Sequence, residues 1–148
     1  MADPVVFTNG FLGLTTATGG TVYTHLVDTE EVTLPISREE LDAAVMGDGA
    51  KTMYPGRLNS DITVRCRQSF SATSADSLLW PYFNNKTAVR CKARAVNAAV
   101  STSNPSYKFD RVYVVNGPGI AGGHGAILKN TYKLVLAPGC IITRSTST

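Results

Sequence analysis

Cysteine and histidine are the residue types in this sequence that could bind a metal ion or pair as nucleophile and base. The chain contains Cys66, Cys91 and Cys140, together with His25 and His124. No C-x-x-C pair occurs, and no cysteine or carboxylate stands at ligand spacing from either histidine, so no metal site is predicted. The odd number of cysteines also argues against a disulfide framework. We expect buried free thiols that act as small apolar side chains.

The glycine-rich segment 117–125 is a second candidate for chemistry, because glycine-rich loops can hold phosphate groups. It lacks the G-x-x-x-x-G-K-[ST] pattern, and a strand pattern follows it instead of the helix whose N-terminus would bind the anion. We therefore expect a hairpin connection. No nucleophile elbow surrounds any serine or cysteine. The sequence predicts no catalytic residue, no metal, no cofactor and no enzyme activity.

Alternating apolar and polar residues predict a fold built mainly of strands. At 148 residues the chain fits one domain. Its composition favours a mainly β or α+β fold over a helical bundle. Weak alternation marks 21–27 and 31–36, where Pro35 indicates a sheet edge or the end of a strand. The strongest alternation predicts strands over 61–70, 88–96, 107–115 and 127–137. In the third of these, one face is expected to carry the aromatic residues Tyr107, Phe109 and Tyr113.

A short helix is expected between the first two strong strands. Ser74 or Thr73 can cap its start, and Asn84-Asn85 can end it. Pro81 limits or kinks it. Apolar residues at i, i+3, i+4 and i+7 or i+8 predict one buried face, made by Ala75, Leu78, Leu79 and Tyr82 or Phe83.

Charge is divided unequally along the chain. Residues 1–50 hold eight acidic residues and one arginine, a net charge of −7, whereas the remainder holds thirteen basic and three acidic residues, a net charge of +10. Three explanations fit this division: neutralisation within one molecule, head-to-tail association of copies, or a basic patch for nucleic acid.

Basic residues alternate along two of the predicted strands. If the strands 61–70 and 88–96 pair, they present one positive stripe. Modules that read single-stranded nucleic acid combine such charges with exposed stacking aromatics, and these two strands carry none on the charged face. A subunit interface or salt-bridged surface is therefore favoured for this stripe, made by Arg65, Arg67, Arg90, Lys92 and Arg94.

The segment 1–20 shows no sustained period and is predicted to be an extended N-terminal arm. Its apolar residues, among them Phe7, Phe11 and Leu12, are candidates for contacts with a neighbouring subunit. The alternative is that they cover the edge of the domain's own core. The domain itself is expected over 21–143, and 144–148 is expected to be a flexible C-terminus.

The stretch GDGAKTMYPGRLNSDITVRCRQSF, which begins at Gly47, is followed closely by the helix pattern SADSLLWPYF. This combination resembles the tail tube proteins of long-tailed bacteriophages, over residues 41–138. The resemblance implies an antiparallel β-sandwich or half-barrel with one flanking helix. It also implies six-membered rings that stack into a hollow tube for DNA, with sheets of neighbouring subunits joined into a continuous inner barrel.

The same resemblance implies assembly in the host cytoplasm, a location in the virion tail, and other tail proteins as partners. No apolar run approaches the roughly 20 residues that span a bilayer, and the N-terminus lacks the features of a secretory signal, so no membrane partner is expected. Alternatives are another virion component, such as a tail terminator, connector ring or capsid decoration protein, and a nucleic-acid-binding module.

The charge division and the resemblance together predict how copies would associate. Acidic residues of the N-terminal half, Glu30, Glu31, Glu39 and Glu40, are expected to meet the positive stripe of the next copy. A lumen that conducts DNA should not hold phosphates, so the stripe is expected at an interface or on the outside of the tube.

Residues 37–46 support two interpretations. Ser37 and Glu40 match a capping box, which favours a helix through Val45. The segment LDAAVMG is too short to form a stable helix on propensity alone, and the resemblance implies an extended chain that runs into the turn at Gly47.

Overall fold

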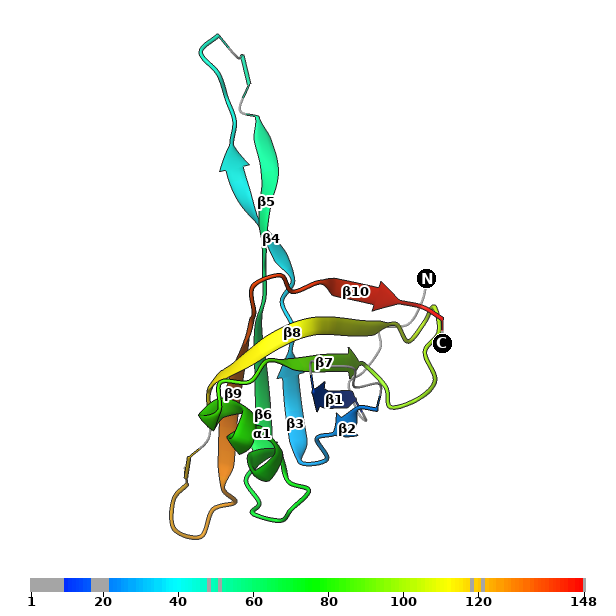
Figure 1. Cartoon of the computed structure of the whole chain (residues 1–148), viewed down its shortest axis with the longest axis vertical. Coiled ribbons are helices and arrows are strands. Elements are labelled where there is room, and N and C mark those ends of the chain that lie inside the picture. Colours follow the sequence, from blue (N-terminus) through cyan, green and yellow to red (C-terminus); the bar gives the residue numbers. More distant parts are fainter. Residues whose placement is uncertain are drawn as a thin grey trace.

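The computed structural model of the chain describes residues 10–16, 22–47, 49–50, 52–117, 119–120 and 122–147. In this part of the chain, one curved antiparallel sheet, a separate two-stranded hairpin and one helix are present (Figure 1). The mainly β fold with one flanking helix confirms the predicted fold class. The sheet order is β2 (Thr24–His25), β1 (Phe11–Thr16), β7 (Val89–Arg94), β8 (Ser106–Asn116), β9 (Lys129–Leu136), β6 (Asp61–Arg67) and β3 (Thr29–Thr33), and β10 (Ile142–Ser145) pairs with β8 beside this path.

Strand β8 bends the sheet at its middle. It pairs with β10 along its first half and with β9 along its second half. Between the halves, Asp110 and Arg111 form a bulge against β7. The bulge changes the side of β8 that faces the core, because Phe109 is buried before it and Val112 after it. Tyr113 therefore lies on the face opposite to Phe109, and the prediction that the aromatic residues of this strand share one face is wrong.

The two ends of the sheet order are joined by a short connection. Strands β2 and β3 are consecutive in the chain but lie at opposite ends of the order. Between them, Leu26 donates its N–H to the carbonyl of Leu12 at 2.9 Å, and Asp28 accepts the N–H of Arg67 at 2.9 Å. These backbone bonds hold the curled sheet as a half-barrel around one core.

Fully buried apolar side chains from β1, β6, β7, β8, β9 and the helix fill this half-barrel. Strands β6 and β7 alternate buried and more exposed residues along their whole length, as their sequence periods predict. The largest fully buried side chains are Tyr132, Phe109, Leu12, Leu26, Ile62, Leu79 and Leu134. No helix in the described part of the chain is long and apolar enough to cross a membrane.

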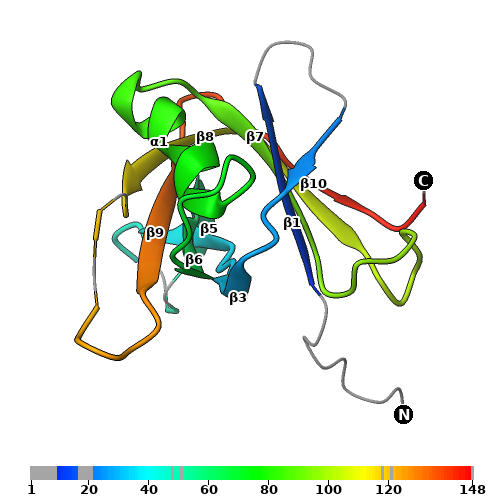
Figure 2. The ribbon, with the colours of Figure 1, turned by 90° about the horizontal axis from the view of Figure 1, so that it is seen from below.

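The helix α1 (Ala75–Asn84) packs beside β8 and β9 (Figure 2). It begins at Ser74, whose Oγ accepts the N–H of Ser77 at 3.3 Å and so satisfies a free donor of the first turn. It ends at Asn85, and Leu79 is fully buried against the sheet. The predicted cap, end and buried face are confirmed.

Strands β3 and β6 continue out of the sheet as a protruding hairpin, formed by β4 (Ser37–Asp42) and β5 (Met53–Asn59) (Figure 1). The extended conformation of Ser37–Asp42 shows that the capping box does not form a helix here. Ladder bonds to β5 outweigh a local helix preference, which is weak in so short a segment. Leu41 packs across Gly56, where an added Cβ would lie 2.9 Å from its Cγ.

Two predicted boundaries are wrong. Phe11–Thr16 is not irregular arm but strand β1, which pairs with β7 over its full length. Arg144 and Ser145, predicted to be flexible, belong to β10 and pair with β8. In both cases backbone pairing with a distant strand orders the segment. Residues 1–9 and 17–20 of the predicted arm lie outside the described residues.

Candidate functional site

The predicted positive stripe does not form as one surface. Strands β6 and β7 belong to the same sheet, but β8 and β9 lie between them. Arg65 and Arg67 of β6 are therefore separated from Arg90, Lys92 and Arg94 of β7. Sequence periodicity places each set on one side of its own strand, whereas the order of strands is decided by long-range pairing.

On the β6 side, charges are neutralised within the molecule. Glu30 accepts a hydrogen bond from Arg67 Nε at 2.8 Å, and its other carboxylate oxygen lies 3.0 Å from Lys129 Nζ. The Arg67 and Lys129 contacts lower the pKa of the Glu30 carboxyl. Glu31 stands opposite Arg65 in the register of β3 with β6, at the border of a polar groove. For this region the structure favours neutralisation within one molecule, which was one of the three explanations for the charge division.

The β7 side carries a denser group of cations. Arg90 pairs with Asp110 at 3.1 Å. Lys92 and Lys108 stand directly opposite each other in the register of β7 with β8, and Arg94 follows two residues after Lys92. Partial burial, together with Arg94 and Lys108 nearby, lowers the pKa of the Lys92 ammonium. We name Lys92, Arg94 and Lys108 the β7 cation face.

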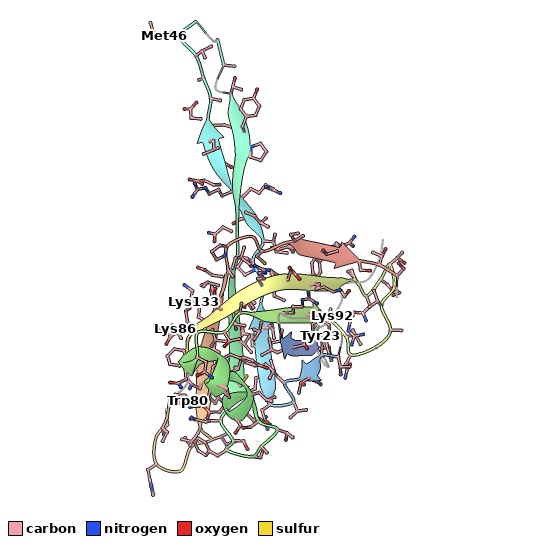
Figure 3. The ribbon with its side chains drawn as sticks, viewed as in Figure 1. Tyr23, Met46, Trp80, Lys86, Lys92 and Lys133 are labelled. Atoms are coloured by element: carbon pink, nitrogen blue, oxygen red, sulfur yellow. The ribbon has the colours of Figure 1, made fainter. Side chains whose placement is uncertain are left out.

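Aromatic side chains from β1 and the residues around β2 lie among these cations. The guanidinium carbon of Arg94 is 4.3 Å from the ring centre of Phe11, which also stacks on His25 with centroids 4.9 Å apart. Lys92 Nζ is 5.7 Å from the ring centre of Tyr23 (Figure 3). Such contacts stabilise a cation by roughly 0.5–1 kcal/mol at exposed sites.

A glycine makes this arrangement possible. A Cβ at Gly13 would lie 2.7 Å from the Phe11 ring and 2.8 Å from Tyr23 Cβ, so both side chains rest against bare backbone. Sequence reasoning missed Tyr23, His25 and Lys108 as neighbours of the cations. The available signal was the alternation in FLGLT, which marks a strand with Phe11 and Gly13 on its outer face.

The hairpin holds the other candidate contacts. All six residues of β4 are exposed, including Glu39 and Glu40. Apolar side chains are exposed along the hairpin and at its tip, where Figure 3 shows Met46 far from the body. This exposed apolar set is Leu41, Val45, Met46, Met53 and Tyr54. Exposed apolar patches of this kind are typical of interaction sites.

The remaining predicted contact residues have different positions. Leu12 is 1% exposed and covers the core of its own subunit, which was the alternative for the apolar residues of the arm. Phe11 lies on the outer face of β1, under Arg94. Phe7 is outside the described residues.

The thiols do not form a reactive site. Burial raises the pKa of Cys66 to about 11 and that of Cys91 to about 12, so both stay protonated near neutral pH. Cys66 and Cys91 are buried, as predicted, and Cys140 is partly exposed. Among the described residues, no group of three or more histidine, cysteine or carboxylate side chains is placed to hold a metal ion.

Comparison by sequence finds no matching family model and no matching curated protein. Comparison by structure finds similar chains in assembled tails and related particles. The SPP1 tail tube subunit matches with a TM-score of 0.73 at 8% identity, covering 98% of this chain and 82% of that chain. A chain of the native gene transfer agent virion matches with a TM-score of 0.67 at 10% identity, covering 89% of this chain and 95% of that chain.

A chain of the tube-terminating cap of the anti-feeding prophage also matches, with a TM-score of 0.65 at 14% identity, covering 99% of this chain and 94% of that chain. The chain therefore has the fold of phage tail tube and related cap proteins, as the sequence resemblance predicted. At these identities the comparison establishes the fold alone.

Proposed function

We propose that the chain is a structural subunit of a phage-type tail tube, in which six copies form a ring and stacked rings enclose a conduit for DNA. The shared fold supports this, and one of the similar structures is a gene transfer agent tail with C6 symmetry. The proposal includes assembly in the host cytoplasm and a final location in the virion tail. The subunit contributes shape and contacts, with no catalytic role.

The observation that carries the proposal is the protruding hairpin. It exposes three apolar side chains on β4 and β5, which form a two-stranded sheet of their own, and two more, Val45 and Met46, in the tip that joins them. Isolated two-stranded hairpins are at best marginally stable in water, so a hairpin of this kind needs a partner surface. A neighbouring subunit can supply that surface in every copy of a regular assembly.

Unpaired sheet edges support ring formation. Strands β2 and β3 end the described sheet order, and β10 ends its branch. An edge strand leaves N–H and C=O groups free to pair with another chain. Joining the sheets of neighbouring subunits would satisfy these groups and close a barrel around the lumen.

The charges are compatible with a conduit. Arg67, Lys129 and Lys133 each pair with a carboxylate of the same chain, which reduces the positive charge available to phosphates. A lumen lined by such pairs would pass DNA without holding it.

Negative-stain microscopy and sedimentation velocity of the purified protein test the proposal. We expect rings with a central hole, and stacked tubes at high protein concentration. A protein that stays monomeric at high concentration and low salt contradicts the proposed function.

A second candidate is a tube terminator or cap, because a tube-terminating cap is among the similar structures. A terminator forms single rings that do not stack, whereas a tube subunit forms particles of many lengths. The length distribution in the same micrographs separates the two. A connector ring or decoration protein would also form single particles, and a nucleic-acid-binding module would instead show salt-dependent DNA affinity as a monomer.

A further inference from the structure

The β7 cation face lacks compensating charge within its own chain. Lys92 and Lys108 stand directly opposite each other, a like-charge pair that destabilises a sheet. In the described part of the chain, none of Lys92, Arg94 and Lys108 forms an ion pair. The nearby carboxylate of Asp110 is already paired with Arg90. The clustered cations are therefore suited to an anionic partner.

Strand β4 of the hairpin carries acidic residues that lack a cationic partner among the described residues. Glu39 and Glu40 are exposed and form no ion pair with any described residue. Their neighbour Arg38 instead donates from Nη1 to the carbonyl of Gly56 at 3.2 Å. The hairpin projects away from the half-barrel, so these acids do not reach the β7 cation face of their own molecule (Figures 1 and 3).

We propose that the β7 cation face binds the acidic strand β4 of a neighbouring copy of the chain. The inference rests on the proposed function and names which surfaces meet when copies associate. Lys92 and Arg94 share one face of β7, about 6.6–7 Å apart along the strand, whereas the consecutive residues Glu39 and Glu40 point to opposite faces of β4. Either carboxylate can therefore meet the cations, according to the face of β4 that docks. The contact is head-to-tail, since each copy presents both surfaces and they differ.

A second copy fits the β7 cation face better than nucleic acid does. Single-stranded nucleic acid binds where aromatic faces are open for base stacking. Here Arg94 lies over the Phe11 ring and His25 stacks on it, while Lys92 lies over Tyr23. These rings already support the cations, which leaves charge as the means of recognition.

A charge-swap experiment tests the docking. The hairpin variant is Glu39→Lys with Glu40→Lys, the face variant is Lys92→Glu with Lys108→Glu, and the fourfold variant combines all four changes. Each double variant should weaken self-association in sedimentation velocity by about tenfold or more, because like charges then face each other. The fourfold variant should associate again, and a mixture of the two double variants should co-assemble.

A matched control reverses two cations outside the face, Lys86→Glu with Lys133→Glu, which Figure 3 shows away from Lys92. Lys133 pairs with Asp61 at the surface at 3.2 Å, and exposed pairs contribute little to stability. The control should associate as the original chain does. Thermal unfolding of every variant checks that its fold is retained.

Each outcome tests the docking contact, the tube function, or both. Normal association of the face variant, or failure of the fourfold variant and the mixture to recover, overturns the docking while leaving the tube function intact. If the face variant associates normally but loses DNA affinity, nucleic acid is the partner. If small oligomers follow the charge-swap pattern but no rings form, the docking stands and the tube function fails. A monomeric original chain contradicts both.

Discussion

The two halves of one long ribbon differ sharply. Its first half, β3 with β6, lies in the main sheet, where Ile62, Val64 and Cys66 of β6 are fully buried. Its second half, β4 with β5, leaves the sheet and buries none of its residues completely. Each of the two chain segments thus runs from a region that packs on the core of the molecule to a region that has no core of its own.

The difference lies in the number of partners that each strand has. Strand β6 pairs with β3 on one side and β9 on the other, and the core covers one of its faces. Strand β5 pairs with β4 alone. A strand with one neighbour and no core gains little free energy on folding. The first half should therefore determine stability, and the second half should determine association.

The largest effect on stability is expected in the buried half of the ribbon. Ile62→Ala should lower the free energy of unfolding by about 2–5 kcal/mol, through lost burial and a residual cavity. Leu79→Ala in α1 should cost a similar amount. Urea denaturation at low protein concentration measures both. Leu41→Ala in the hairpin is the matched control, and an equal loss there would remove the distinction between the halves.

A smaller effect is expected at a hydrogen bond between the helix and the sheet. Tyr132, fully buried in β9, donates its hydroxyl proton to Asp76 Oδ1 at 3.2 Å. Tyr132→Phe removes this bond and should cost about 1 kcal/mol, a typical net value for one hydrogen bond. Tyr54→Phe in the hairpin should change nothing measurable in the same denaturation series. Equal stability of Tyr132→Phe and the original chain would show that the bond contributes no net free energy.

A pH-dependent effect is expected at Glu30. Its pKa in the folded chain lies below its ordinary value of 4.5, because Arg67 and Lys129 stabilise the carboxylate. The resulting stability is fully present above the unfolded pKa and is lost as the pH falls through the lowered folded pKa. Glu30→Gln should be less stable than the original chain at pH 7, and the difference should disappear toward acid pH. Thermal unfolding across this range measures it, and a gap that does not depend on pH contradicts the assignment.

The smallest effect on stability is expected in the hairpin. Tyr54→Ser and Met53→Ser should each change the free energy of unfolding by no more than about 0.5 kcal/mol, as exposed substitutions usually do. The same variants should reduce ring and tube formation, because they remove apolar surface that a neighbour covers. A loss of more than about 1 kcal/mol in either variant would show that the hairpin belongs to the cooperative folding unit of the monomer.

Elements with a local pattern can be predicted from the sequence alone. The alternation of 61–70, 88–96, 107–115 and 127–137 corresponds to β6, β7, β8 and β9, and the cap at Ser74 corresponds to the start of α1. These signals depend on side chains that are neighbours along the chain, so they can be read before any tertiary contact is known.

Which strands are neighbours and which charges meet depends on contacts between segments that are distant in the sequence. Phe11–Thr16 and β10 become strands because they pair with distant segments, and Ser37–Asp42 is extended because it pairs with β5. The bulge at Asp110 and Arg111 reverses the faces of β8, and the strand order separates the arginines of β6 from the cations of β7. Backbone pairing between distant segments carries no period in the sequence, because every residue offers the same N–H and C=O groups except proline. The aromatic support of the β7 cation face, the neutralisation of Glu30 and the exposure of the hairpin all follow from that pairing.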